Sequence, residues 1–108
     1  MTNTIEAGIH GAGRKNLSHA LRNLIPFKTS GSLSGRETCY NSGRLTGEDL
    51  ERFNRDSRVG FRYVVTSYAT PIAWMTTDGE IYRVAQKFSV TTSKHQSKLW
   101  ELGLDINN

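Results

Sequence analysis

Residues 87–96 read KFSVTTSKHQ and gather hydroxyl, ammonium and imidazole groups in one short stretch. An alternating apolar segment ends here and a helix is predicted to begin near Ser93, so free backbone N–H groups would meet hydroxyls and positive charge at one corner. That combination suits an anion such as a phosphate group. The predicted anion or nucleic-acid site at this corner comprises Lys87, Thr91, Thr92, Ser93, Lys94, His95 and Lys98.

A structural role for the same hydroxyls is the alternative. At a helix start, Thr92 or Ser93 would accept a backbone N–H, which stabilises a helix by about 1 kcal/mol. A capping turn usually gains from acidic side chains, whereas this turn would carry Lys94 and His95. A conflict between a local rule and the sequence often marks a functional site. Both interpretations, helix capping and contact with an anion or partner, therefore stay open.

Catalysis at the corner requires groups that the sequence does not supply. Ser93 and His95 are two residues apart and would not face each other on a helix, and no G-x-S-x-G motif is present. His10, His19 and His95 lack metal-ligand spacing, and the single Cys39 excludes a cysteine-based metal site. The sequence predicts no catalytic residue, no metal and no cofactor, with an enzyme centred on His95 as a third hypothesis.

The positive charge of the chain is concentrated in its first part. The 108 residues suit one small domain with a formal charge of +4 and a sequence pI of about 9.5. Residues 1–45 carry six basic and two acidic side chains, an excess equal to the whole net charge. This distribution makes nucleic acid a candidate partner and adds Arg14 and Lys15 to the candidate nucleic-acid-binding residues.

Aromatic side chains offer a second way to bind a partner. We expect most of them to pack in the core, but a sheet face bare of helices would let some form a stacking platform for single-stranded nucleic acid. Trp74 and Tyr68 are the candidates for contact with a protein partner or with a second copy of the chain.

Local patterns predict three helices and a small sheet. The helices are expected at about 16–25, 46–57 and 93–102, from apolar residues at helical spacing and from capping residues. Residues 61–92 alternate like strands and contain a hairpin signal at Asp78–Gly79. Within the first strand, Phe61, Tyr63 and Val65 would share one face and Val64 the other.

These elements predict an α+β fold, with a small antiparallel sheet of three or four strands and the helices packed mainly on one face. Residues 1–15 read as a flexible N-terminal arm, and residues 16–108 as a single domain. The Ser/Gly-rich stretch 28–45 reads as a long loop. No apolar run is long enough for a membrane helix, and the first residues lack the apolar core of a signal peptide, so no membrane contact is expected.

Two motifs, YVVTSYATPIAW at 63–74 and FSVTTSKHQ at 88–96, resemble an uncharacterised family of small actinobacteriophage proteins. The resemblance covers roughly residues 60–100. It rests on Tyr63, Val65, Ser67, Tyr68, Thr70, Pro71, Ile72, Ala73 and Trp74, followed by Phe88, Ser89, Thr91, Thr92, Ser93, His95 and Gln96. It implies a phage origin and a small intracellular product, and it brings no catalytic residues.

The sequence as a whole therefore predicts a small phage accessory protein that acts by binding in the cytoplasm of the host cell. The first hypothesis is nucleic-acid association through a basic surface. The alternative is a host-protein-binding effector or a homo-oligomeric structural or interaction protein.

Overall fold

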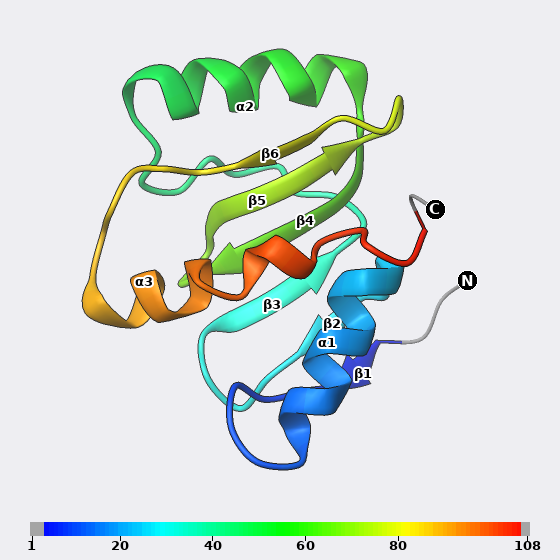
Figure 1. Ribbon diagram of the computed structural model, residues 1–108. Coiled ribbons are helices and arrows are strands. Elements are labelled where there is room, and N and C mark those ends of the chain that lie inside the picture. The colour runs from blue at the N-terminus through cyan, green and yellow to red at the C-terminus, as the bar shows by residue number, and fades with distance from the viewer. Residues whose placement is uncertain (1–3, 107–108) are drawn as a thin grey trace.

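The structure, a computed structural model, describes residues 4–106 and has an α+β fold built on one six-stranded sheet (Figure 1). The strands follow chain order; β1 is parallel to β2, and every other neighbouring pair is antiparallel. The elements are β1 Ile5–Glu6, α1 Gly13–Asn23, β2 Phe27–Lys28, β3 Leu33–Arg36, α2 Gly47–Val59, β4 Phe61–Ser67, β5 Thr70–Thr76, β6 Ile81–Arg83, α3 Val90–Gln96 and the 3-10 helix η1 Leu99–Glu101. The α+β class is confirmed, whereas a sheet of three or four antiparallel strands is too small.

The additional strands come from segments that the sequence assigns to an arm and a loop. Strand β1 and the first turn of α1 lie within the predicted arm 1–15, and β3 lies within the predicted loop 28–45. These strands are short and carry at most a weak apolar period, so pairing with neighbouring strands is what reveals them. Residues 1–3 of the predicted arm and residues 107–108 of the predicted domain lie outside the described residues.

The expected helices all have a counterpart, with one divided in two. Helix α1 buries Leu17 and Leu21, as their spacing predicts. The segment predicted as one helix at 93–102 instead forms α3 and η1. After η1, the backbone N–H of Gly103 donates to the carbonyl of Leu21 at 2.9 Å, which holds the C-terminal segment against α1. Within residues 4–106, no helix is long and apolar enough to cross a membrane.

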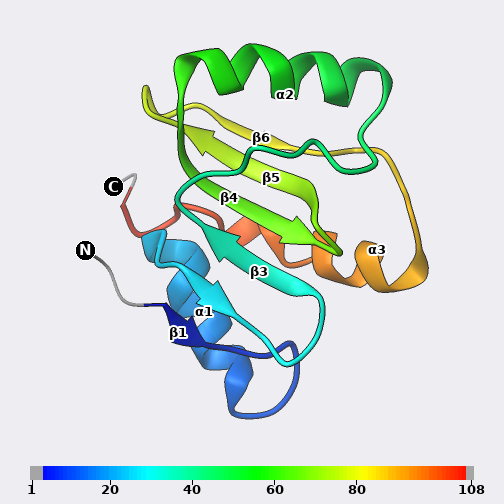
Figure 2. The ribbon, with the colours of Figure 1, turned by 180° about the vertical axis from the view of Figure 1, so that it is seen from behind.

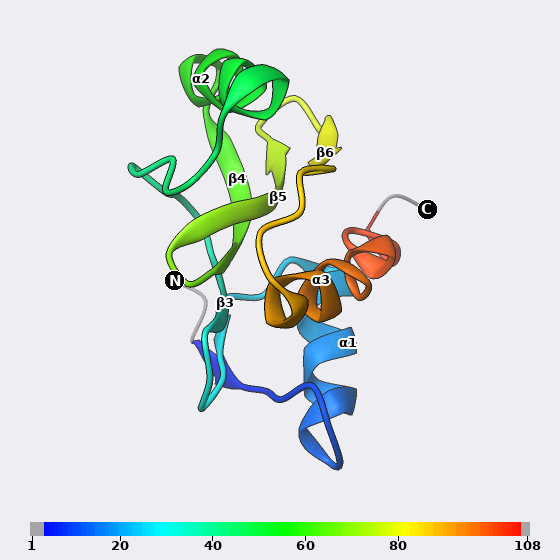
Figure 3. The same ribbon diagram turned by 90° about the vertical axis from the view of Figure 1, so that its left-hand side faces the viewer.

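Helices lie on both faces of the sheet: most of them are on one face, as predicted, but α2 covers the other. Figure 3 shows α1, α3 and η1 on one side and α2 on the other. The reason is that β4 and β5 are buried on both faces: Tyr63 and Val65 pack in a core cluster with α1 and η1, while Val64 and Trp74 pack in a second cluster under α2. A strand that is apolar on both faces needs a cover on each.

A register shift places Phe61 on an unexpected face. The pairing of β4 with β5 shifts between Phe61 and Tyr63, as a bulge does. Because of this shift, Phe61 packs against the cluster of α2, with its ring 5.2 Å from that of Phe53 and 6.0 Å from that of Trp74. The prediction that Phe61 shares a face with Tyr63 and Val65 is therefore wrong.

Buried polar contacts fix α2 over the β4–β6 half of the sheet. The buried carboxylate of Asp56 accepts hydrogen bonds from the Trp74 indole at 2.8 Å and from Arg52 Nε at 2.9 Å. The Tyr82 hydroxyl donates to Asp49 at 2.6 Å, and this bond raises the pKa of Tyr82 to about 12. Buried charges are tolerated when they are paired in this way. With α2 fixed here, no helix within residues 4–106 covers β2 and β3 on the same side of the sheet (Figure 2).

Candidate functional site

The helix at the predicted anion site, residues 87–98, begins earlier than the sequence predicts. Helix α3 starts at Val90, and its N-cap is Ser89, whose extended backbone lets its Oγ accept the Thr92 N–H at 3.1 Å. The prediction that Thr92 or Ser93 is the cap is therefore wrong. Both residues lie inside the helix, so the direction of each hydroxyl depends on which side of the helix its residue occupies.

Two of the predicted anion ligands point into the protein. Thr92 and His95 share one side of α3, since residues three apart on a helix are neighbours, and each is only 3% exposed. The hydroxyl of Ser67, from the end of β4, lies 2.8 Å from His95 Nδ1 and 3.2 Å from Thr92 Oγ1. Burial lowers the pKa of His95, which favours a neutral ring. Thr92 and His95 thus form an internal network, and they do not face an anion.

The other residues of the predicted site remain near the surface. Lys87, Thr91 and Lys94 are exposed, and Ser93 and Lys98 are half-buried. The structure does not bring these side chains together around the inward-facing pair Thr92 and His95. Arg14 and Lys15 are exposed in the first turn of α1, an element packed on the opposite side of the sheet from α2.

The contact between Ser67 and His95 resembles a nucleophile and its base only in residue types. Both side chains are buried, and within residues 4–106 no carboxylate is hydrogen-bonded to His95. A catalytic pair needs access to substrate and a group that orients the base. Among the described residues, no three His, Cys, Asp or Glu side chains gather where they could hold a metal ion.

Of the two predicted partner-binding aromatics, only Tyr68 is at the surface. Trp74 is 0% exposed, because its indole packs edge-on against Phe53, with ring centroids 5.4 Å apart, and donates to Asp56. The prediction that Trp74 contacts a partner is therefore wrong. Tyr68 is 60% exposed in the two-residue turn between β4 and β5.

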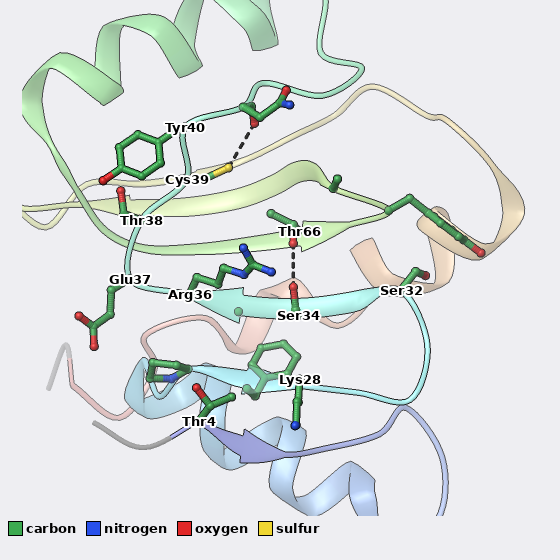
Figure 4. Close-up of a pocket in the computed structure, with 16 residues that line it drawn as sticks. Thr4, Lys28, Ser32, Ser34, Arg36, Glu37, Thr38, Cys39, Tyr40 and Thr66 are labelled. Atoms are coloured by element: carbon green, nitrogen blue, oxygen red, sulfur yellow. Dashed lines mark hydrogen bonds between the residues drawn. The ribbon is translucent and has the colours of Figure 1, made fainter. Parts of the chain in front are cut away.

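The uncovered part of the sheet forms a groove of about 1020 Å³, here called the open-face groove (Figure 4). Its floor is the side of β2, β3 and β4 that faces away from α1. Two exposed aromatic residues from the connecting segments also line it. The residues that define it are Lys28, Ser34, Arg36, Thr66, Tyr40 and Tyr68.

The floor of the groove combines hydroxyls with positive charge. Ser34 and Thr66 are paired across β3 and β4, and their hydroxyl oxygens lie 2.9 Å apart. Lys28 and Arg36 are exposed, and neither belongs to an ion pair within residues 4–106. Glu37 is the acidic side chain among the lining residues. The arrangement can bind a ligand that carries both negative charge and flat apolar surface.

Packing on the opposite face of β3 decides which of its side chains reach the groove. A side chain at Gly35 would collide with the Phe27 ring and the Tyr63 hydroxyl. Glycine therefore allows β3 to lie close over the core, and alternation turns Ser34 and Arg36 outward. The Tyr63 hydroxyl donates to the carbonyl of Ile25 at 2.7 Å, and burial raises the pKa of Tyr63.

Sequence reasoning missed the groove because most of its residues belong to the Ser/Gly-rich stretch. Lys28, Arg36 and Tyr40 have no strong strand pattern around them. A weak signal exists, since the small or apolar Leu33 and Gly35 alternate with the polar Ser34 and Arg36. The excess of positive charge in residues 1–45 points to the same segment.

Comparison with known protein families places most of the groove and all of α3 in one family domain. A family model matches residues 12–105, and it describes a family of unknown function, DUF8033. The chain belongs to this family. The predicted membership of an uncharacterised family is thus supported, and the match extends beyond residues 60–100 to include α1, β2 and β3. No curated protein and no solved structure matches the chain. Both the α3 corner and the strands of the open-face groove belong to the DUF8033 domain.

Proposed function

We propose that this DUF8033 protein binds nucleic acid and that the bound nucleic-acid strand lies in the open-face groove. One observation carries the proposal: the side of β2–β4 that no described helix covers presents Lys28 and Arg36 together with the exposed rings of Tyr40 and Tyr68. Positively charged grooves with aromatic side chains hold nucleic acid strands by pairing with phosphates and stacking on bases.

The distribution of charge supports this placement. Apart from residues 66–69, the lining of the groove comes from residues 4–41, within the segment that carries the excess positive charge. Among the described residues, Lys28 and Arg36 have no acidic partner, so phosphates would not have to displace an ion pair there. The presence of Glu37 limits the local charge. We therefore expect few phosphate contacts and modest affinity.

A salt titration with matched double variants tests the proposal. Binding of a fluorescently labelled single-stranded oligonucleotide is followed by anisotropy across a series of salt concentrations. Loss of two phosphate contacts in K28A/R36A should reduce the slope of log K against log salt by about 1.4 and weaken binding at low salt. K87A/K94A removes the same charge from exposed lysines outside the groove, and should change binding much less.

Two results would contradict the proposal in different ways. If the wild-type protein fails to bind at low salt, nucleic-acid binding itself is wrong. If K87A/K94A loses as much affinity as K28A/R36A, general positive charge carries the binding, and the groove has no special role.

A second candidate function is binding to a host protein or to a second copy of the chain. The observation that favours it is the exposure of three aromatic rings, with Tyr40 94%, Tyr68 60% and Trp100 59% exposed. Aromatic side chains often dominate the binding energy of protein interfaces. Such binding should survive moderate salt and nuclease treatment, and it should fail when Tyr40 or Trp100 is replaced by alanine. Light scattering of the purified protein tests for a homo-oligomer.

The origin and location of the protein follow from the sequence motifs as proposals. The resemblance at 63–74 and 88–96 supports a phage origin, and the single Cys39 is in keeping with a reducing compartment such as the cytoplasm of a host cell. Fractionation of infected cells, followed by detection of the protein in the cytoplasmic fraction, tests this location.

A further inference from the structure

The turn between β4 and β5 has an unusual backbone for its sequence. Ser67 pairs with Thr70, and the two residues between them, Tyr68 and Ala69, have φ of 51° and 67°. Two-residue hairpin turns with positive φ at both positions normally use Asn-Gly or similar pairs. Tyrosine and alanine are unfavourable there because their Cβ atoms crowd the backbone in this conformation.

Packing does not explain why a tyrosine occupies this turn. The Tyr68 side chain is 60% exposed, and within residues 4–106 its hydroxyl forms no hydrogen bond. Its backbone is well held, since the Tyr68 N–H donates to the carbonyl of Ser32 at 3.1 Å. The ring therefore projects from a firmly anchored hairpin at the border of the open-face groove, where it is available to a ligand.

A second exposed ring stands at the other end of the groove. In Figure 4, Ser32, whose carbonyl anchors the Tyr68 turn, lies at one end of β3, and Tyr40 lies near the other end. Ser34 lies within β3, and Arg36 is the last residue of that strand, at the end away from Ser32. The groove thus has an aromatic residue toward each end, and Lys28, which pairs with Ser34, lies between them.

We infer that Tyr68 stacks on an unpaired base and that the ligand of the open-face groove is a single strand, an inference that rests on the proposed function. Stacking on a tyrosine ring requires a base with an open face, and the bases of a duplex already stack on both sides. Phosphates that continue from the stacked base along the groove would meet Lys28 and Arg36. The shared chemistry is an unpaired base with a phosphodiester, which DNA and RNA both offer.

The test compares three ligands and four proteins by anisotropy. The ligands are one mixed sequence as single-stranded DNA, as single-stranded RNA and as a DNA duplex. The proteins are the wild type, Tyr68→Asn, Tyr68→Phe and Ala69→Gly. Asparagine tolerates the positive φ, so Tyr68→Asn removes the ring and keeps the turn. Tyr68→Phe keeps the ring, and Ala69→Gly relieves the turn without touching the ring.

Stacking predicts a specific pattern. Tyr68→Asn should weaken binding of at least one single strand about tenfold, while Tyr68→Phe and Ala69→Gly remain within about twofold of wild type. The duplex should bind wild-type protein more weakly than the preferred single strand and should be insensitive to Tyr68→Asn. Comparison of the DNA and RNA arms then identifies which strand the groove prefers.

Other outcomes overturn the inference and show which part fails. If K28A/R36A loses binding but Tyr68→Asn binds single strands like wild type, the groove binds phosphates and Tyr68 does not stack. If the duplex binds as tightly as either strand, the single-strand assignment is wrong. If no oligonucleotide binds and Tyr68→Asn instead dissociates a homo-oligomer seen by light scattering, both this inference and the proposed function fail, and the groove is a protein interface.

Discussion

The α3 corner and the open-face groove contain similar residues with opposite surroundings. At the corner, the polar side chains of Ser67, Thr92 and His95 bind one another and are buried. In the groove, Lys28 and Arg36 face solvent, and neither is held in an ion pair within residues 4–106. Hydroxyls beside positive charge therefore do not identify a binding site on their own, since what matters is whether charged side chains there face solvent and have no ion-pair partner.

The position of the helices produces this difference. Helix α3 packs its inner side against the end of β4, so any polar group there must find a partner within the protein. Helix α2 is held over β4–β6 by Asp56 and Asp49, so no helix of the described residues covers β2 and β3 on that side. Four measurements test whether the residues around α3 have a structural role and whether the turn beside the groove is strained.

The largest effect is expected from His95→Ala. The substitution leaves Ser67 without its imidazole partner and opens a cavity, so the free energy of unfolding should fall by about 2–4 kcal/mol. Urea unfolding measures the change. The neighbouring exposed residue gives the control, since Lys94→Ala should change stability by less than about 0.5 kcal/mol. Equally small losses for both variants would argue against a structural corner.

The next effect is expected from Thr92→Val. Valine keeps the shape of the side chain but removes the hydroxyl that contacts Ser67 and accepts from Ser89 Oγ, so stability should fall by about 1–2 kcal/mol. The exposed Thr91 provides a matched control, because Thr91→Val makes the same change outside the network. Thermal and urea unfolding of the two variants should differ clearly. Identical behaviour would mean that the buried hydroxyl network contributes nothing.

A smaller change in stability, of opposite sign, is expected in the turn between β4 and β5. Ala69→Gly should raise the free energy of unfolding by about 0.5–1 kcal/mol, because glycine adopts the positive φ of this turn without steric cost. Ala12→Gly is the control, since Ala12 has φ of −63° and no strain to relieve. Differential scanning calorimetry of both variants measures the change. A loss of stability in Ala69→Gly would show that the turn is unstrained.

The smallest change in the free energy of unfolding is expected from the protonation of His95 as the pH falls. Burial lowers the pKa of His95 in the folded protein, so the unfolded chain binds a proton more readily. The contribution of His95 to the free energy of unfolding is therefore fully present above the pKa of histidine in the unfolded chain, about 6.5. It is lost as the pH falls below that value toward the lower pKa of His95 in the folded protein. His95→Gln should remove this part of the pH dependence in urea unfolding series. An unchanged profile would contradict a buried neutral histidine.

Local signals predict a substantial part of the fold. The spacing of Leu17 and Leu21 predicts α1, and Asp78–Gly79 predicts the hairpin between β5 and β6, where Gly79 has φ of 92°. Strand β3 is not predictable in this way, because its pairing with β4 joins Ser34 to Thr66, far away in the sequence. The candidate site follows the same division, since Tyr68 is among the predicted partner-binding residues whereas Tyr40 and Arg36 are not predicted.

Features that depend on neighbouring residues are readable from the amino-acid order alone: helical periodicity, the β5–β6 turn and the α+β class. Composition adds the net charge of +4, which is concentrated before residue 46. The tertiary structure alone decides which polar groups face water. His95 turns inward because Ser67, 28 residues earlier, lies beneath it, and Arg36 stays outside because Gly35 packs on the Phe27 ring. Burial arises from contacts between distant segments, so the same residue types become a core network at one place and an open surface at another.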